Sequence, residues 1–71
     1  MAVNYQYAFA EIDLDTNMCI GVFTTTNPAE GDFPMHVAIP VYDEEYVFKY
    51  YIDGNWYVDA EGTIPWASSL A

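Results

Sequence analysis

Hydrophobic and polar residues alternate along the first third of this chain with a period of two, the pattern of half-buried β-strands. Residues 5–13 divide into two faces: Tyr5, Tyr7, Phe9 and Glu11 on one, and Gln6, Ala8, Ala10 and Ile12 on the other. Residues 18–25 divide in the same way: Met18, Ile20 and Val22 against Cys19, Gly21 and Phe23. With the polar segment 13–17 as a turn between them, these stretches predict a β-hairpin.

The middle of the chain is irregular. Residues 27–34 contain two prolines and a glycine without periodicity and predict a loop. Residues 35–41 predict a short extended strand, and Pro40 places it at a sheet edge because proline has no N–H to donate. Asp43 is a helix N-cap residue followed by two acids, so a single helical turn is expected over residues 43–46.

Strand-like residues return near the C-terminus, over residues 47–52 and 56–58. Between them stands Asp53-Gly54, the strongest hairpin signal in the chain, since glycine tolerates the positive φ of a type I′ turn. Residues 59–62 predict another turn. Residues 63–71 predict a tail that is flexible or docked on a partner, and it carries Trp66.

Together these elements predict one small all-β domain spanning residues 1–71. Its four or five antiparallel strands would form a meander or a partly open barrel with one short helical turn. Aromatic and aliphatic residues occupy both faces of residues 46–58, although one face of a single antiparallel sheet is usually polar. Either the sheet rolls up and encloses both faces, or one face is a contact surface.

Charge narrows the classes of partner. The 71 residues include eleven acids, one Lys and no Arg, for a formal net charge of −10. Such a chain cannot neutralise nucleic-acid phosphates and has no attraction for an anionic membrane surface. No apolar run approaches the roughly 18–20 residues of a membrane span, and the N-terminus lacks the basic and apolar regions of a signal peptide. The single cysteine cannot form an internal disulfide.

One turn has the ligand spacing of a calcium loop. Asp13, Asp15 and Asn17 place oxygen atoms on alternate residues, as in D-x-D-x-N. The sixth position is Met18 instead of glycine, and the twelfth is Thr24 instead of glutamate. A polar hairpin turn therefore accounts for the segment better than a cation site.

Catalytic candidates are few. Cys19 lies between apolar neighbours and is expected to be buried and inert, and His36 is the only histidine. A Cys19–His36 pair stays open as a minor alternative. Carboxylates are so abundant that their pairing carries no signal, and no glycine-rich phosphate loop exists. We expect a non-enzyme without metal or cofactor.

The C-terminal hairpin is similar to the G-x-W-Y hairpins of choline- and glucan-binding cell-wall repeats. The matching residues are Gly54-Asn55-Trp56-Tyr57, followed by Gly62 and Trp66. Exposed aromatic rings of this kind stack on sugars and on quaternary ammonium groups. The resemblance implies a carbohydrate-binding module as one alternative function, although the chain has one copy instead of an array.

A second resemblance covers about half of the chain. The residues are Tyr7-Ala8-Phe9-Ala10-Glu11-Ile12-Asp13, Cys19-Ile20-Gly21-Val22, Ile39-Pro40-Val41-Tyr42-Asp43-Glu44-Glu45-Tyr46 and Lys49-Tyr50-Tyr51-Ile52-Asp53-Gly54-Asn55-Trp56-Tyr57. This order resembles small proteins encoded in tailed phages and prophages, often beside tail-fibre or other virion genes, with the patterns YAxID…CxGV, IPxYDExY and KYxxGxWY. The resemblance implies a virion protein made in the host cytoplasm, and it supplies no catalytic residues.

The leading hypothesis is therefore a structural or interaction protein of a phage particle, in its tail or head. Its partner would be another phage structural protein or further copies of itself. A second alternative is an acidic inhibitor that imitates DNA, although its acids lie mainly in turns instead of in one stripe. The residues expected to make contacts are exposed aromatics: Tyr50, Tyr51, Trp56, Tyr57 and Trp66.

Overall fold

The computed structural model describes residues 7–71, and they form one open antiparallel sheet with the strand order β3-β1-β2-β4-β5. The strands are β1 (Tyr7–Asp13), β2 (Met18–Thr25), β3 (His36–Ile39), β4 (Tyr50–Ile52) and β5 (Asn55–Tyr57). Two short 3-10 helices, η1 (Pro28–Asp32) and η2 (Glu44–Tyr46), connect them. The all-β prediction is confirmed. Tyr5 and Gln6, assigned to the first strand from the pattern, lie outside the described residues.

The β1–β2 hairpin forms as predicted, but it contains a β-bulge. Glu11 pairs with Gly21, whereas the next residue, Ile12, pairs with Cys19, so Ile20 is an extra residue on β2. The strict alternation predicted for residues 18–25 is therefore wrong. Because of the extra residue, Cys19 and Val22, which the pattern assigned to opposite faces, lie on the same face and in the same hydrophobic cluster. The bulge leaves Ile20 exposed.

The predicted loop after β2 contains η1. Asn27 caps it by accepting a hydrogen bond from the Ala29 N–H at 3.0 Å, and Pro28 occupies the first turn, where no N–H is needed. This connection runs back along the sheet, so β3 enters beside β1 instead of β2. Strand β3 is an edge strand, as Pro40 indicated.

Segment η1 covers one face of the sheet. Gly31 lies so close to the ring of Phe9 that an added Cβ would overlap it. The Phe23 ring lies 5.6 Å from that of Phe9 and 5.0 Å from the His36 imidazole, measured between centroids. The imidazole Nδ1 lies 2.6 Å from the Glu30 carbonyl oxygen. The space between η1 and the sheet is therefore filled by a small cluster of aromatic rings.

The helical turn predicted at residues 43–46 is η2. The Asp43 carboxylate accepts a hydrogen bond from the Glu45 N–H at 2.9 Å and caps it. The strand predicted over residues 47–52 is shorter, because Phe48 has φ 74° and interrupts the extended backbone. The Phe48 N–H donates a hydrogen bond to the Cys19 carbonyl at 2.8 Å, and the Phe48 side chain is 68% exposed.

The Asp53-Gly54 hairpin is confirmed. Both residues have positive φ, 52° and 85°, as a type I′ turn requires. The paired residues are Tyr50 with Tyr57, Tyr51 with Trp56 and Ile52 with Asn55, so the return strand begins one residue before its predicted start.

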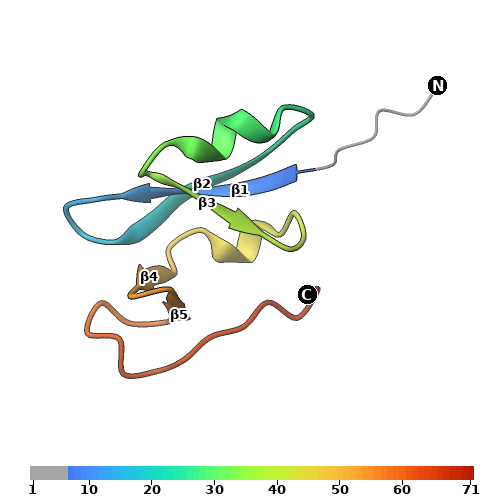
Figure 1. Cartoon of the computed structure of the whole chain (residues 1–71). Coiled ribbons are helices and arrows are strands. Elements are labelled where there is room, and N and C mark those ends of the chain that lie inside the picture. Colours follow the sequence, from blue (N-terminus) through green and yellow to red (C-terminus); the bar gives the residue numbers. More distant parts are fainter. Residues whose placement is uncertain (1–6) are drawn as a thin grey trace.

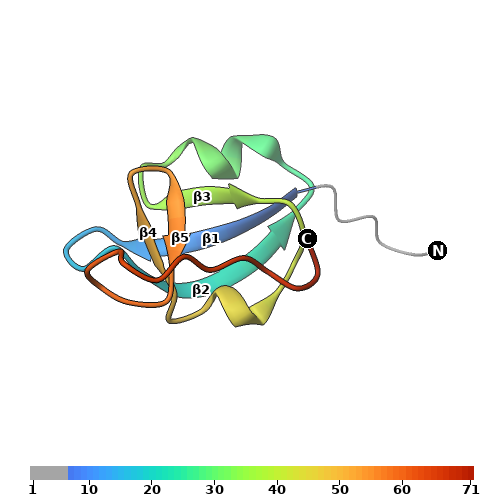
Figure 2. The same ribbon diagram turned by 90° about the horizontal axis from the view of Figure 1, so that it is seen from below.

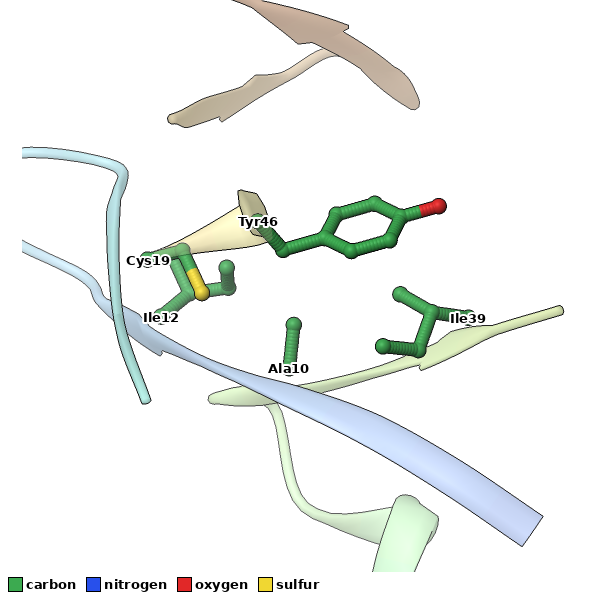
Figure 3. Close-up of a cluster of buried hydrophobic side chains, with 5 residues drawn as sticks. All are labelled: Ala10, Ile12, Cys19, Ile39 and Tyr46. Carbon is green, nitrogen blue, oxygen red and sulfur yellow. The ribbon is translucent and has the colours of Figure 1, made fainter. Parts of the chain in front are cut away.

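The main core lies on the sheet face opposite η1. Figure 3 shows the Tyr46 ring extending from η2 above Ala10, with Cys19 and Ile12 on one side and Ile39 on the other. Burial raises the pKa of the Tyr46 hydroxyl, and the nearby Asp43 carboxylate adds to the effect. This cluster holds the long strands to the C-terminal part of the chain.

The overall arrangement has three layers. In Figure 1 the η1 connection lies above β1, β2 and β3, whereas η2, β4, β5 and the C-terminal segment lie below them. Figure 2, seen from below, shows the β4–β5 hairpin crossing the longer strands at a steep angle. The sheet bends sharply between β2 and β4, whose register contains the single pair Met18–Tyr50. The sheet thus folds partly over itself without closing.

Candidate interaction site

Three of the five aromatic residues expected to make contacts converge on the core. The Trp56 and Trp66 rings each lie 4.8 Å from the Tyr46 ring, at interplanar angles of 69° and 83°. Tyr51 packs on Trp56 at 5.0 Å. Edge-to-face pairs at these distances stabilise a folded domain. These three rings are thus partly buried in contacts within the protein.

Tyr50 and Tyr57 form a cross-strand pair on the other face of the hairpin. Both are partly buried. Gly62 lies beside this face, since a Cβ there would approach Ile52 at 3.2 Å and the Tyr57 ring at 3.7 Å. The five aromatics therefore divide into two groups on opposite faces, and their role in binding stays a prediction.

The C-terminal segment, for which a flexible or partner-docked tail was expected, lies against the domain itself. The Val58 N–H donates to the Ile64 carbonyl at 2.8 Å, and the Trp66 N–H donates to the Trp56 carbonyl at 3.0 Å. Further along, the buried Ser68 hydroxyl donates to the Asp43 carboxylate. The tail covers the free edge of β5 and carries Trp66 onto Tyr46.

The single lysine also belongs to this cluster. Lys49 Nζ lies 4.9 Å from the centroid of the Trp66 ring and donates a hydrogen bond to the Glu45 carbonyl at 3.1 Å. This is a cation–π contact. The only Lys or Arg side chain of the sequence is therefore engaged at the tail.

Cys19 and His36 do not meet. The Cys19 thiol lies in the Tyr46 cluster and donates to the Gly21 carbonyl at 3.3 Å, whereas His36 packs between Phe23 and Phe33 in the η1 layer. Burial raises the pKa of the Cys19 thiol, which favours the unreactive form. The two side chains offer no nucleophile–base pair.

The Asp13–Asn17 region forms a polar turn. The Asp13 carboxylate accepts from the Asp15 N–H at 3.0 Å, its carbonyl accepts from the Asn17 N–H at 2.6 Å, and Asn17 adopts φ 65°. Among residues 7–71, no group of three or more His, Cys, Asp or Glu side chains is placed to hold a metal ion.

An exposed apolar hollow lies beside this turn, and the sequence pattern did not reveal it. Leu14 from the turn, Ile20 from the bulge and Met35 from the entry to β3 are 59%, 50% and 39% exposed. They line a shallow, open hollow of about 300 Å³ together with Ile12 and three acids: Glu11, Asp13 and Asp15. We call these seven residues the acidic-rimmed patch.

A larger hollow, of about 1080 Å³, lies at the opposite end of the long strands. It runs from Phe9 and Phe23 past the β3 edge at Ala38 to Tyr42. Among the described residues that line this hollow, only Asp32 is charged. Its walls are mixed, with both aromatic rings and hydroxyl groups, so they specify no particular ligand.

Comparison with protein-family models, with curated proteins and with solved structures finds no match for this chain. In residues 7–71, none of the helices has the length and hydrophobicity that a bilayer crossing demands.

Proposed function

We propose that this chain is a non-enzymatic interaction protein of a tailed-phage particle, mounted on a tail or head component. The observation that carries the proposal is the acidic-rimmed patch. Three exposed apolar side chains, Leu14, Ile20 and Met35, line one hollow there together with three acids. Contiguous apolar surface with a polar rim is typical of a protein–protein contact. The resemblance to small proteins of tailed phages and prophages, often encoded beside virion genes, supplies the setting.

The two alternatives have less support. A carbohydrate platform needs exposed flat rings, whereas Trp56 and Trp66 are partly buried against Tyr46 and the Lys49 ammonium lies over the Trp66 ring. A DNA mimic needs a continuous stripe of charge. Here exposed acids occupy separate turns, at Asp15, Asp53 and Glu61.

The test is whether the chain co-purifies with the phage particle. Particles of the phage or induced prophage that encodes the chain are purified through a density gradient and probed with an antibody against it. We expect a fixed number of copies per particle, unchanged by a second gradient, while a host cytosolic marker is lost. Recovery of the chain only in the soluble fraction of the lysate would contradict the proposal.

A further inference from the structure

The acidic-rimmed patch combines two properties that together specify a partner. Part of its lining is apolar, from Ile12, Leu14, Ile20 and Met35, and this part favours contact with apolar side chains. Its remaining lining is Glu11, Asp13 and Asp15. The sequence's single lysine is engaged with Trp66 and Glu45, so it does not neutralise this rim.

Charge complementarity then selects the occupant. An apolar partner without positive charge would desolvate the three carboxylates and leave them unpaired, which is costly. A second copy of this chain would bring further acids to the same rim. A partner segment with Lys or Arg next to an aliphatic residue would meet both requirements. Its aliphatic side chain would cover the apolar lining, and its positive charge would pair with the carboxylates.

We propose that the acidic-rimmed patch docks a segment of another protein in which aliphatic residues stand next to lysine or arginine. The proposal rests on the proposed function, since it names the surface by which the chain would join the particle. The β-bulge is the feature that builds the site. Without the extra residue Ile20, β2 would pass the turn with an uninterrupted register and present no isoleucine there.

The first experiment uses a defined probe. The ¹⁵N-labelled chain is titrated with the peptide acetyl-Lys-Leu-Lys-Leu-Leu-Lys-amide, while amide chemical shifts are followed by NMR. We expect saturable shifts at Leu14, Ile20 and Met35. A peptide with glutamate in place of lysine should not bind, and one with serine in place of leucine should bind about tenfold more weakly. Shifts spread evenly over all acidic turns would overturn the proposal.

Matched variants separate the apolar contribution from the charge. Ile20→Thr should weaken peptide binding about tenfold, whereas Ile64→Thr, at a similarly exposed isoleucine (54%), should leave it unchanged. Glu11→Gln with Asp15→Asn should weaken binding and reduce its salt dependence, whereas Glu45→Gln with Glu61→Gln, the same change in charge, should not. Asp13 is left intact because its carboxylate holds the turn. Equal affinities across each pair would overturn the site.

The second experiment follows the same variants into particles. Incorporation of wild type and Ile64→Thr but not Ile20→Thr supports the patch. Equal incorporation of all three overturns the patch and leaves the proposed function standing. If the wild type itself is absent from particles, the proposed function fails. The peptide titration alone then decides whether the acidic-rimmed patch is a binding site. Salt-promoted self-association that Ile20→Thr abolishes would identify a second copy as the occupant and overturn the basic partner.

Discussion

The hydroxyl of Ser68 donates a hydrogen bond to the carboxylate of Asp43, 25 residues earlier in the chain, and both residues are buried. The same carboxylate caps η2, so one side chain fixes both the helical turn that carries Tyr46 and the C-terminal segment that covers it. The Ser68 oxygen in turn accepts the Leu70 N–H at 3.1 Å. This pair is the farthest anchor of the tail.

We predict that Ser68→Ala destabilises the domain by about 1–3 kcal/mol, because it removes a donor from a buried carboxylate. The matched control is Ser69→Ala, at the exposed neighbouring serine, which should change stability by less than about 0.5 kcal/mol. Urea unfolding followed by tryptophan fluorescence measures both. Equal midpoints for the two variants would show that the bond does not hold the tail.

Gly54→Val should destabilise by more than about 1 kcal/mol, since a β-branched side chain resists the positive φ of 85° that the turn imposes. Gly54→Asn is the control, because asparagine tolerates this conformation. Space is not the cause, as nothing lies within 4 Å of an added Cβ. Thermal melting that fails to separate the two variants would contradict the turn assignment.

Gly31→Ala should destabilise by about 1–3 kcal/mol, the usual cost of overpacking, because its methyl group would overlap the buried Phe9 ring. Phe9 cannot easily yield, since it also packs on Phe23. Gly21→Ala is the control, with open space at its Cβ and an expected neutral or slightly stabilising effect. The comparison tests whether η1 lies on the sheet as described.

Asp59 gives a pH prediction. Hydrogen bonds from the Thr63 hydroxyl and the Ile64 N–H lower the pKa of its carboxyl. The ionised form therefore stabilises the fold fully above the unfolded pKa of about 3.9, and this stabilisation is lost as the pH falls through the lower folded pKa. Asp59→Asn should reduce the melting temperature at pH 7, and the difference from wild type should shrink in acid. Glu61→Gln, at an exposed acid in the same turn, is the control and should leave the melting temperature at pH 7 unchanged.

The chain should not bind double-stranded DNA or RNA at physiological salt. With one Lys against eleven acids it cannot release the counterions that drive such binding. A gel-shift titration to micromolar protein is the measurement. A shift that weakens with added salt would contradict the prediction.

Local signals in the sequence predicted the elements whose causes are local. The alternation of β1, the Asp43 cap and the Asp53-Gly54 turn each depend on a few adjacent residues, and each occurs as predicted. The bulge at Ile20 and the left-handed Phe48 were missed, because each is one residue that interrupts an otherwise regular pattern. Neither residue is a glycine or proline, which would mark the interruption.

The candidate site was missed for the same reason. Leu14, Ile20 and Met35 are separated in sequence, and only the bulged register and the return of β3 bring them together. The aromatics Trp56 and Trp66 stood out by composition, yet composition cannot tell an exposed ring from one packed against Tyr46.

The placement of the lone lysine has a consequence for proteolysis. Trypsin cleaves after Lys and Arg, so this sequence offers it a single bond, Lys49–Tyr50. That bond lies where β2 meets β4: the Lys49 carbonyl accepts the Cys19 N–H at 2.7 Å, and the Lys49 ammonium rests on Trp66. Cleavage requires this junction to open and the C-terminal segment to lift. Trypsin thus becomes a reporter of one defined opening event.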